Sequence, residues 1–149
     1  MQAPTYSRRV RACLIVDDSQ TVRRAVAAAV RATRKVEEVH EAGDPAEALQ
    51  LFESRQPELV FLDMMLAGDA ARDPNGESAK GLEVLRSMLA SRPDTHIVVI
   101  TGLPSSQPDV VDAISLGALA ALRKPVKAED IRYVLDSIQP DKARMDYFG

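Results

Sequence analysis

Four short, largely apolar runs, each followed by a polar residue, constrain the fold of this chain more than any other feature. Near-continuous apolar runs are typical of parallel strands that are buried on both faces of a sheet. The carboxyl ends of parallel strands share one edge, which is where open α/β sheets bind ligands. We therefore expect the residues after the runs to meet in one crevice: 12–16 precede Asp17 and Asp18, 59–62 precede Asp63, 97–100 precede Thr101, and 119–123 precede Lys124.

Between these runs apolar residues recur at helical spacing, so strand and helix alternate along the chain. This alternation predicts an α/β fold: a five-stranded parallel sheet with helices on both faces, doubly wound in the flavodoxin-like (βα)5 arrangement. In the first helix, over 20–33, the arginines Arg23, Arg24 and Arg31 fall on faces other than that of the valines. The other expected elements are a strand over 36–40, a helix capped by Asp44, and helices that contain Leu85, Val110 and Ile131.

The composition limits the classes of function. The chain has 149 residues, 46% hydrophobic and 4% aromatic, and reads as one soluble, globular domain. Its net charge of −3, with dispersed Lys and Arg, does not suit a nucleic-acid partner. No apolar run in the sequence approaches the length of a membrane-spanning helix, which is about 20 residues. The single cysteine, Cys13, is expected to be buried in a strand, which excludes a disulfide framework and favours the cytoplasm.

The expected organisation is a lead-in over 1–10, one domain over 11–139 and a tail over 140–149. Within the domain, the connection over 64–80 is long, because a strand-to-helix loop usually takes about 2–6 residues. It is rich in Gly, Asp, Asn and Pro, which form turns. We interpret this connection as a solvated surface insertion.

The polar residues at the expected edge suit a divalent metal and a phosphoryl group. Asp17, Asp18 and Asp63 would repel one another unless a cation neutralises them, and Mg²⁺ binds a few carboxylates together with waters and phosphate oxygens. Lys124 supplies a positive charge for a phosphate or a carboxylate, and Thr101 supplies a hydroxyl. Each residue alone has a plain explanation as a cap, turn or loop residue. Together, and in this order, they describe phosphoryl transfer to a carboxylate, with Asp63 attacking in line.

The span 10–139 resembles the receiver domain of two-component response regulators. The resemblance is carried by residues 14–19, 59–63, 98–102 and 117–125. It implies that the chain takes a phosphoryl group from the phosphohistidine of a sensor histidine kinase or of a histidine phosphotransfer protein.

The resemblance also implies a role for each site residue. Asp63 would be the phosphoacceptor. Asp18 and Asp63 would bind Mg²⁺ (or Mn²⁺) directly, Asp17 mainly through water, and Met65 through its backbone carbonyl. Lys124 would pair with one phosphate oxygen, and Thr101 would move to bond another and so report that the site is phosphorylated.

The chain departs from the family pattern at three positions. Ala67 stands where a proline usually follows the acceptor, the usual glycine is displaced to Gly81 by the insertion, and Ala121 replaces the aromatic residue that commonly precedes the lysine. The coupled threonine-and-aromatic switch is therefore absent in its usual form, and we expect the output to be routed elsewhere. One hypothesis is that phosphorylation orders the 64–80 connection or that this connection contacts a partner.

Two bulky apolar residues suggest a long-lived phosphoryl group. Met65 lies two residues after Asp63, and Leu103 lies two residues after Thr101. Because neither side chain can orient a hydrolytic water, we predict slow self-dephosphorylation.

The favoured function is a stand-alone, cytoplasmic receiver whose phosphorylation changes its binding to an unknown downstream protein. Its chemistry would be limited to phosphorylation and dephosphorylation of its own Asp63, so it is not expected to be an enzyme. The alternative is a non-phosphorylated interaction module of the same fold. A Mg²⁺-dependent phosphatase with an aspartate nucleophile is less favoured, because that class separates its two aspartates by one residue whereas Asp17 and Asp18 are adjacent. The apolar last helix leaves a homodimer open.

Overall fold

The computed structural model describes residues 9–66, 80–102 and 106–138, and these form five strands that alternate with five helices. The strands are β1 (Val10–Val16), β2 (Val36–Ala42), β3 (Leu59–Asp63), β4 (His96–Thr101) and β5 (Ala120–Arg123). The helices are α1 (Gln20–Ala32), α2 (Pro45–Arg55), α3 (Lys80–Ser91), α4 (Pro108–Leu116) and α5 (Ala128–Ser137). The strand order is β2-β1-β3-β4-β5, and every neighbouring pair is parallel. The predicted doubly wound α/β fold is therefore confirmed.

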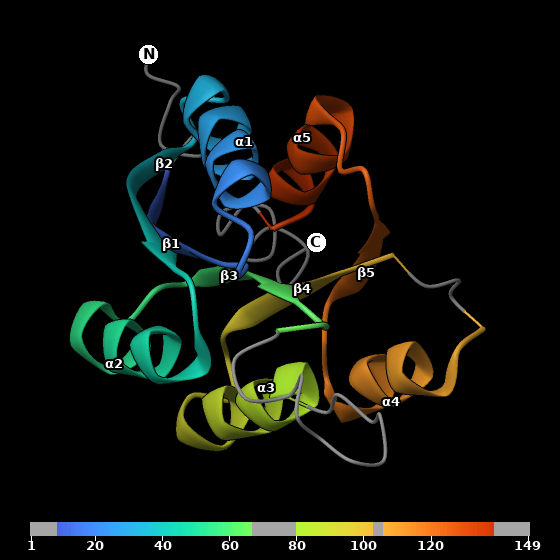
Figure 1. Ribbon diagram of the computed structural model, residues 1–149. Helices are drawn as coiled ribbons and strands as arrows, with labels where there is room; N and C mark the ends of the chain where they lie inside the picture. The colour runs from blue at the N-terminus through green and yellow to red at the C-terminus, as the bar shows by residue number, and fades with distance from the viewer. Residues whose placement is uncertain (1–8, 67–79, 103–105, 139–149) are drawn as a thin grey trace, which may run out of the picture.

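The sheet is covered on both faces, as Figure 1 shows: α1 and α5 lie on one side, and α2, α3 and α4 lie on the other. Alternate residues of each inner strand supply the two cores. Leu14 and Leu62 face the three-helix side, whereas Ile15 and Phe61 face α1 and α5. Since side chains alternate across a strand, burial on both faces requires the near-continuous apolar runs seen in the sequence.

Local sequence signals account for the helix starts on both sides of the sheet. Ser19 caps α1 by accepting a hydrogen bond from Val22 N at 3.3 Å. Asp44 caps α2 by accepting from Glu47 N at 2.8 Å, and Glu47 Oε1 accepts from Gly43 N at 2.8 Å. The Asp44 cap is the one that the sequence predicts, and the Glu47 side chain adds a bond to the backbone of the residue before the cap.

Cys13 and the apolar face of the last helix are both packed into the core. Cys13 is fully buried, and burial raises the pKa of its thiol, so it is a core residue as predicted. The periodic apolar face of α5 packs inward. Ile131, Val134 and Leu135 of α5 and its C-cap Ile138 are buried in the core shared with α1 and the sheet, whereas Tyr133 on the same helix is 74% exposed.

Parts of the predicted organisation lie outside the described residues. These parts are 1–8, 67–79, 103–105 and 139–149, which include Ala67, Leu103 and most of the expected insertion and tail. Within the described residues, no helix has the length and apolar character needed to cross a membrane.

The helix after the insertion returns to a position close against the site. Gly81, in the first turn of α3, is buried against the backbone of Met64, the residue after β3. A Cβ at position 81 would lie only 2.5 Å from the Met64 carbonyl oxygen and 2.6 Å from its Cα. Glycine is therefore required here by close backbone approach.

Candidate functional site

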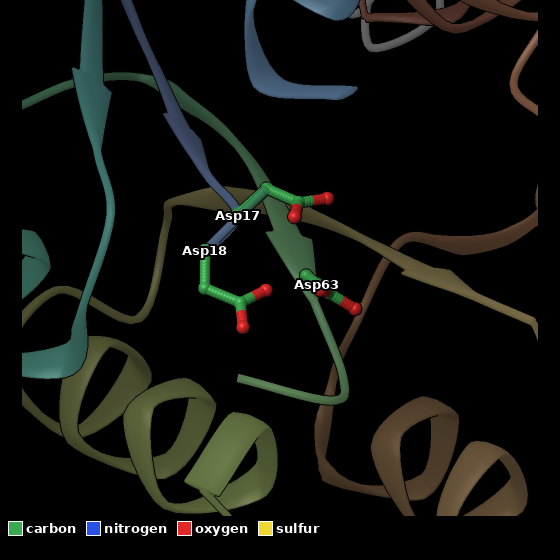
Figure 2. A group of neighbouring side chains, drawn as sticks. All are labelled: Asp17, Asp18 and Asp63. Carbon is green, nitrogen blue, oxygen red and sulfur yellow. The ribbon is translucent and has the colours of Figure 1, made fainter. Parts of the chain in front are cut away.

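The three acidic residues predicted to meet do so at the carboxyl edge of the sheet. Asp17 and Asp18 follow β1, and Asp63 is the last residue of β3. The two strands are paired so that Val16 lies opposite Leu62, which places the ends of both strands side by side. Figure 2 shows the three side chains beside one another, and one carboxylate oxygen from each lies within 4.8 Å of the others.

The two buried carboxylates are each held by a backbone hydrogen bond. Asp63 and Asp17 are both 2% exposed, whereas Asp18 is exposed. Asp63 Oδ1 accepts from Met65 N at 3.0 Å, and Asp17 Oδ1 accepts from Ser19 N at 2.8 Å. In both cases the side chain bonds the backbone two residues later, which fixes its rotamer and leaves the other oxygen, Oδ2, directed elsewhere.

Lys124 brings a positive charge to both of these oxygens. It follows β5, and its Nζ lies 3.3 Å from Asp63 Oδ2 and 3.4 Å from Asp17 Oδ2. The lysine backbone is tied to β4 because Lys124 N donates to Thr101 O at 2.8 Å. Thr101 ends β4 and is 2% exposed, so strands β1, β3, β4 and β5 each place a predicted site residue at this edge.

Burial and neighbouring charges at this edge shift the pKa of two groups, the Asp63 carboxyl and the Lys124 ammonium. Burial raises the pKa of the Asp63 carboxyl above its ordinary value, and the nearby charge of Asp17 raises it further. The Met65 N–H and Lys124 act in the opposite direction but do not outweigh burial. Burial lowers the pKa of Lys124, but the Asp63 and Asp17 carboxylates together raise it above its usual value, so the lysine is charged at neutral pH.

The donor set fits a hard divalent cation. Three carboxylates face one ammonium group, so the group carries excess negative charge when all three are ionised. Asp17 Oδ2 is fully buried, and among the described residues its only polar partner is Lys124 Nζ at 3.4 Å, which it shares with Asp63. Burying a carboxylate that shares one ammonium group with a second carboxylate is costly, and an oxygen-seeking cation such as Mg²⁺ relieves that cost.

One contributor to the site was not predicted. Arg23 was expected only to lie on a face of α1 away from the valines, but its guanidinium turns back to the end of β1. Nη1 donates to Asp17 O at 2.8 Å, and Nε donates to Glu41 Oε1 on β2 at 3.1 Å. The sequence hinted at this contact only by placing an arginine about one helical turn after Ser19, the residue that caps α1. Its partner Glu41 is 18 residues away in the chain, so periodicity could not identify the contact.

Position 121 also has a defined environment. Ala121 lies in β5, at the edge of the sheet, and is half-buried. It lines a cavity of about 390 Å³ together with Lys124 and the start of α5. An alanine has no ring that could rotate in this space, and a route of signal transfer other than the usual threonine-and-aromatic pair stays a prediction.

Comparisons with known proteins agree with this geometry. The family model of the response regulator receiver domain matches residues 13–136. Among solved structures, the receiver domain of NtrX from Brucella abortus superposes with a TM-score of 0.70 at 30% identity, covering 84% of this chain and 95% of that one. The receiver domain of AraT from Geobacillus stearothermophilus superposes with a TM-score of 0.73 at 25% identity, covering 92% and 98%.

Curated relatives match over part of their length. The acid tolerance regulatory protein ActR of Sinorhizobium medicae is 34% identical over 118 residues, which is 79% of this chain and 54% of ActR. The DNA-binding transcriptional activator DevR/DosR of Mycobacterium tuberculosis is 27% identical over 132 residues, which is 89% of this chain and 56% of that protein. The chain thus spans about half the length of these two relatives. Because the family model covers most of the chain and the fold agrees, the protein belongs to the response regulator receiver domain family.

Proposed function

We propose that Asp63 is a phosphoacceptor that receives a phosphoryl group from the phosphohistidine of a sensor histidine kinase or of a histidine phosphotransfer protein. The observation that carries this proposal is the placement of Asp63. It is buried at the carboxyl edge of the central strand, with its Oδ2 3.3 Å from Lys124 Nζ and two further carboxylates beside it. Such a set combines a nucleophile, a fixed cation and a metal-binding group in one place.

The geometry suggests how each residue takes part. The Met65 N–H holds Asp63 Oδ1, so we assign Oδ2 as the attacking oxygen. A bond forms between Oδ2 and phosphorus while the phosphorus–nitrogen bond breaks, and the electron pair of that bond returns to the imidazole of the donor. Lys124 Nζ is already within ion-pair distance of Oδ2 and moves onto a phosphoryl oxygen. Thr101, at the end of the neighbouring strand, offers its hydroxyl to another phosphoryl oxygen.

A divalent ion, Mg²⁺ or Mn²⁺, would be held by the carboxylates of Asp17, Asp18 and Asp63 and by the Met65 carbonyl. When bound, it would neutralise negative charge on the carboxylates and on the phosphoryl oxygens. Without it, the excess negative charge at this edge opposes the approach of a phosphoryl group. Since Asp63 itself carries the product, we regard the chain as a signalling module, with a cytoplasmic location and a change in partner binding as its output.

The direct test is intact mass after incubation with acetyl phosphate and Mg²⁺. We expect the parent to gain one phosphate that hydroxylamine removes, because hydroxylamine cleaves acyl phosphates. Asp63→Asn and a magnesium-free sample should gain none. Asp112→Asn is the matched control, because Asp112 is exposed on α4 and should leave the adduct unchanged.

The opposite result would favour a different function. If the parent gains no phosphate and also fails to bind the phosphoryl mimic fluoroberyllate, the chain acts as a non-phosphorylated interaction module of receiver fold. If the adduct forms but persists in Asp63→Asn, another residue is the acceptor and the assignment of Asp63 is wrong.

A further inference from the structure

Arg23 joins three parts of the chain that meet beside the acidic site. Its Nη1 donates to the Asp17 carbonyl at 2.8 Å, and its Nε donates to Glu41 Oε1 at 3.1 Å. The Arg23 side chain is only 16% exposed and that of Glu41 only 25%, so this pair is shielded from water more than an ordinary surface ion pair. The contact links the first turns of α1 to the end of β1 and the end of β2.

The atom that Arg23 holds belongs to the backbone between the two adjacent acidic residues. The Asp17 carbonyl belongs to the peptide unit that joins Asp17 to Asp18. On the other side, Asp17 N donates to the Ala42 carbonyl at 3.1 Å. No described residue hydrogen-bonds the exposed carboxylate of Asp18, so among the described residues its position is set by its backbone and by its own rotamer. Arg23 restrains the peptide unit between Asp17 and Asp18 through its bond to the Asp17 carbonyl.

We propose that Arg23 and Glu41 are positioning residues for the divalent metal of the phosphoacceptor site, acting through the Asp17–Asp18 peptide unit. This inference rests on the proposed function of the site. Metal affinity depends on the orientation of residues that support the ligands, and losing such a support typically weakens metal binding by about 10–100-fold. Arginine suits the role because its planar fork donates in two directions at once, to a carbonyl and to a carboxylate.

A positioning role and a simple charge effect predict opposite changes in metal affinity when Arg23 is replaced. Arg23 carries a positive charge near a site for a cation, so its charge alone opposes metal binding. If Arg23 acted only through its charge, Arg23→Gln would bind metal more tightly than the parent. If it positions the Asp17–Asp18 peptide unit, Arg23→Gln binds metal more weakly, by about tenfold.

The experiment measures Mn²⁺ affinity directly, through the loss of the electron paramagnetic resonance signal of free Mn²⁺, with Mg²⁺ as competitor. The variants are Arg23→Gln, Arg23→Lys and Arg24→Gln. Arg24 is the matched control because it is exposed and adjacent in sequence, and its substitution changes the net charge equally. We expect about tenfold weaker binding for Arg23→Gln, a partial recovery for Arg23→Lys, and parent affinity for Arg24→Gln.

Gly43→Ala perturbs the same contact without changing any charge. A Cβ at position 43 would lie 3.1 Å from Arg23 Nη1, so the guanidinium would have to shift by a few tenths of an ångström. We expect a smaller loss of affinity in the same direction as for Arg23→Gln. Thermal unfolding without metal shows whether each variant is folded at the temperature of the binding assay.

The outcomes separate this inference from the proposed function. If the parent itself binds no Mn²⁺, the metal site of the proposed function is wrong. If the parent binds Mn²⁺ and folded Arg23→Gln binds it as well as or better than Arg24→Gln, the metal site stands and the positioning role of Arg23 is overturned. Weaker binding by Arg23→Gln and Gly43→Ala, with parent affinity for Arg24→Gln, supports the inference.

Discussion

The burial of Asp63 places an ionisable group where its charged form is costly. Its pKa is raised above the ordinary value of 3.8, mainly by burial. As the pH rises from below 3.8, the carboxyl of the unfolded chain loses its proton before that of the folded chain. The free energy of unfolding contributed by Asp63 therefore falls over that window and stays low at neutral pH.

Asp63→Asn should consequently stabilise the metal-free protein at neutral pH. Asparagine keeps an oxygen that can accept from Met65 N and carries no charge. We expect the variant to be more stable than the parent at pH 7, where the parent must hold a buried charge, and to show almost no gain near pH 3, where both states of the parent are protonated. Urea unfolding at several pH values measures this. Equal stability of parent and variant at pH 7 would contradict the argument.

Met65 gives a second prediction at the residue scale, on the lifetime of the phosphoryl group. Its side chain is 46% exposed and apolar, so it offers no hydrogen bond to a hydrolytic water. We expect slow dephosphorylation of the parent, and Met65→Asn should accelerate it by up to about tenfold, well below the effect of a fully positioned general base. Ile114→Asn, at a position 45% exposed on α4, is the control that should not change the rate. An unchanged rate for Met65→Asn would remove this explanation.

At the scale of elements, α3 is fixed against the site by a glycine. Gly81→Ala would force a Cβ into the backbone of Met64, which directly follows Asp63. We expect a loss of about 1–3 kcal/mol in the free energy of unfolding, as for overpacked cores, together with reduced phosphorylation by acetyl phosphate. Ser87→Ala adds no such contact, because Ser87 is exposed on the same helix, and it should leave both unchanged. Parent-like stability of Gly81→Ala would show that α3 can move away from Met64 without cost.

At the scale of the whole molecule, metal binding should stabilise the fold because the site joins residues from distant parts of the chain. Ligand at ten times its dissociation constant stabilises a protein by about 1.4 kcal/mol, which corresponds to about 4–5 °C for a domain of this size. We expect such a rise in Tm with Mg²⁺ for the parent and none for Asp18→Asn. A sample in KCl at the same ionic strength is the control for a rise in Tm caused by general screening of charges. An equal rise in both would place the bound metal elsewhere.

Much of the fold was predictable because its signals are local. The apolar runs around Ile15 and Phe61 show burial on both faces, and the Asp44 cap marks a helix start within four residues of sequence. Asp17, Asp18, Asp63, Thr101 and Lys124 could be predicted as a group, since parallel strands present their carboxyl ends at one edge. The apolar last helix shows the limit of such signals. Its periodicity identified a buried face but not what covers it, and the structure places that face against α1 and the sheet.

The sequence by itself determined the order of the elements and the chemistry of the edge, because both follow from runs of a few neighbouring residues. Only the tertiary structure decided the contacts between segments far apart in the chain. Lys124 reaches both Asp17 and Asp63, Arg23 reaches the Asp17 carbonyl, and Gly81 rests on Met64. These contacts depend on strand register and helix placement, which arise from packing of the whole core and leave no periodic mark in the sequence.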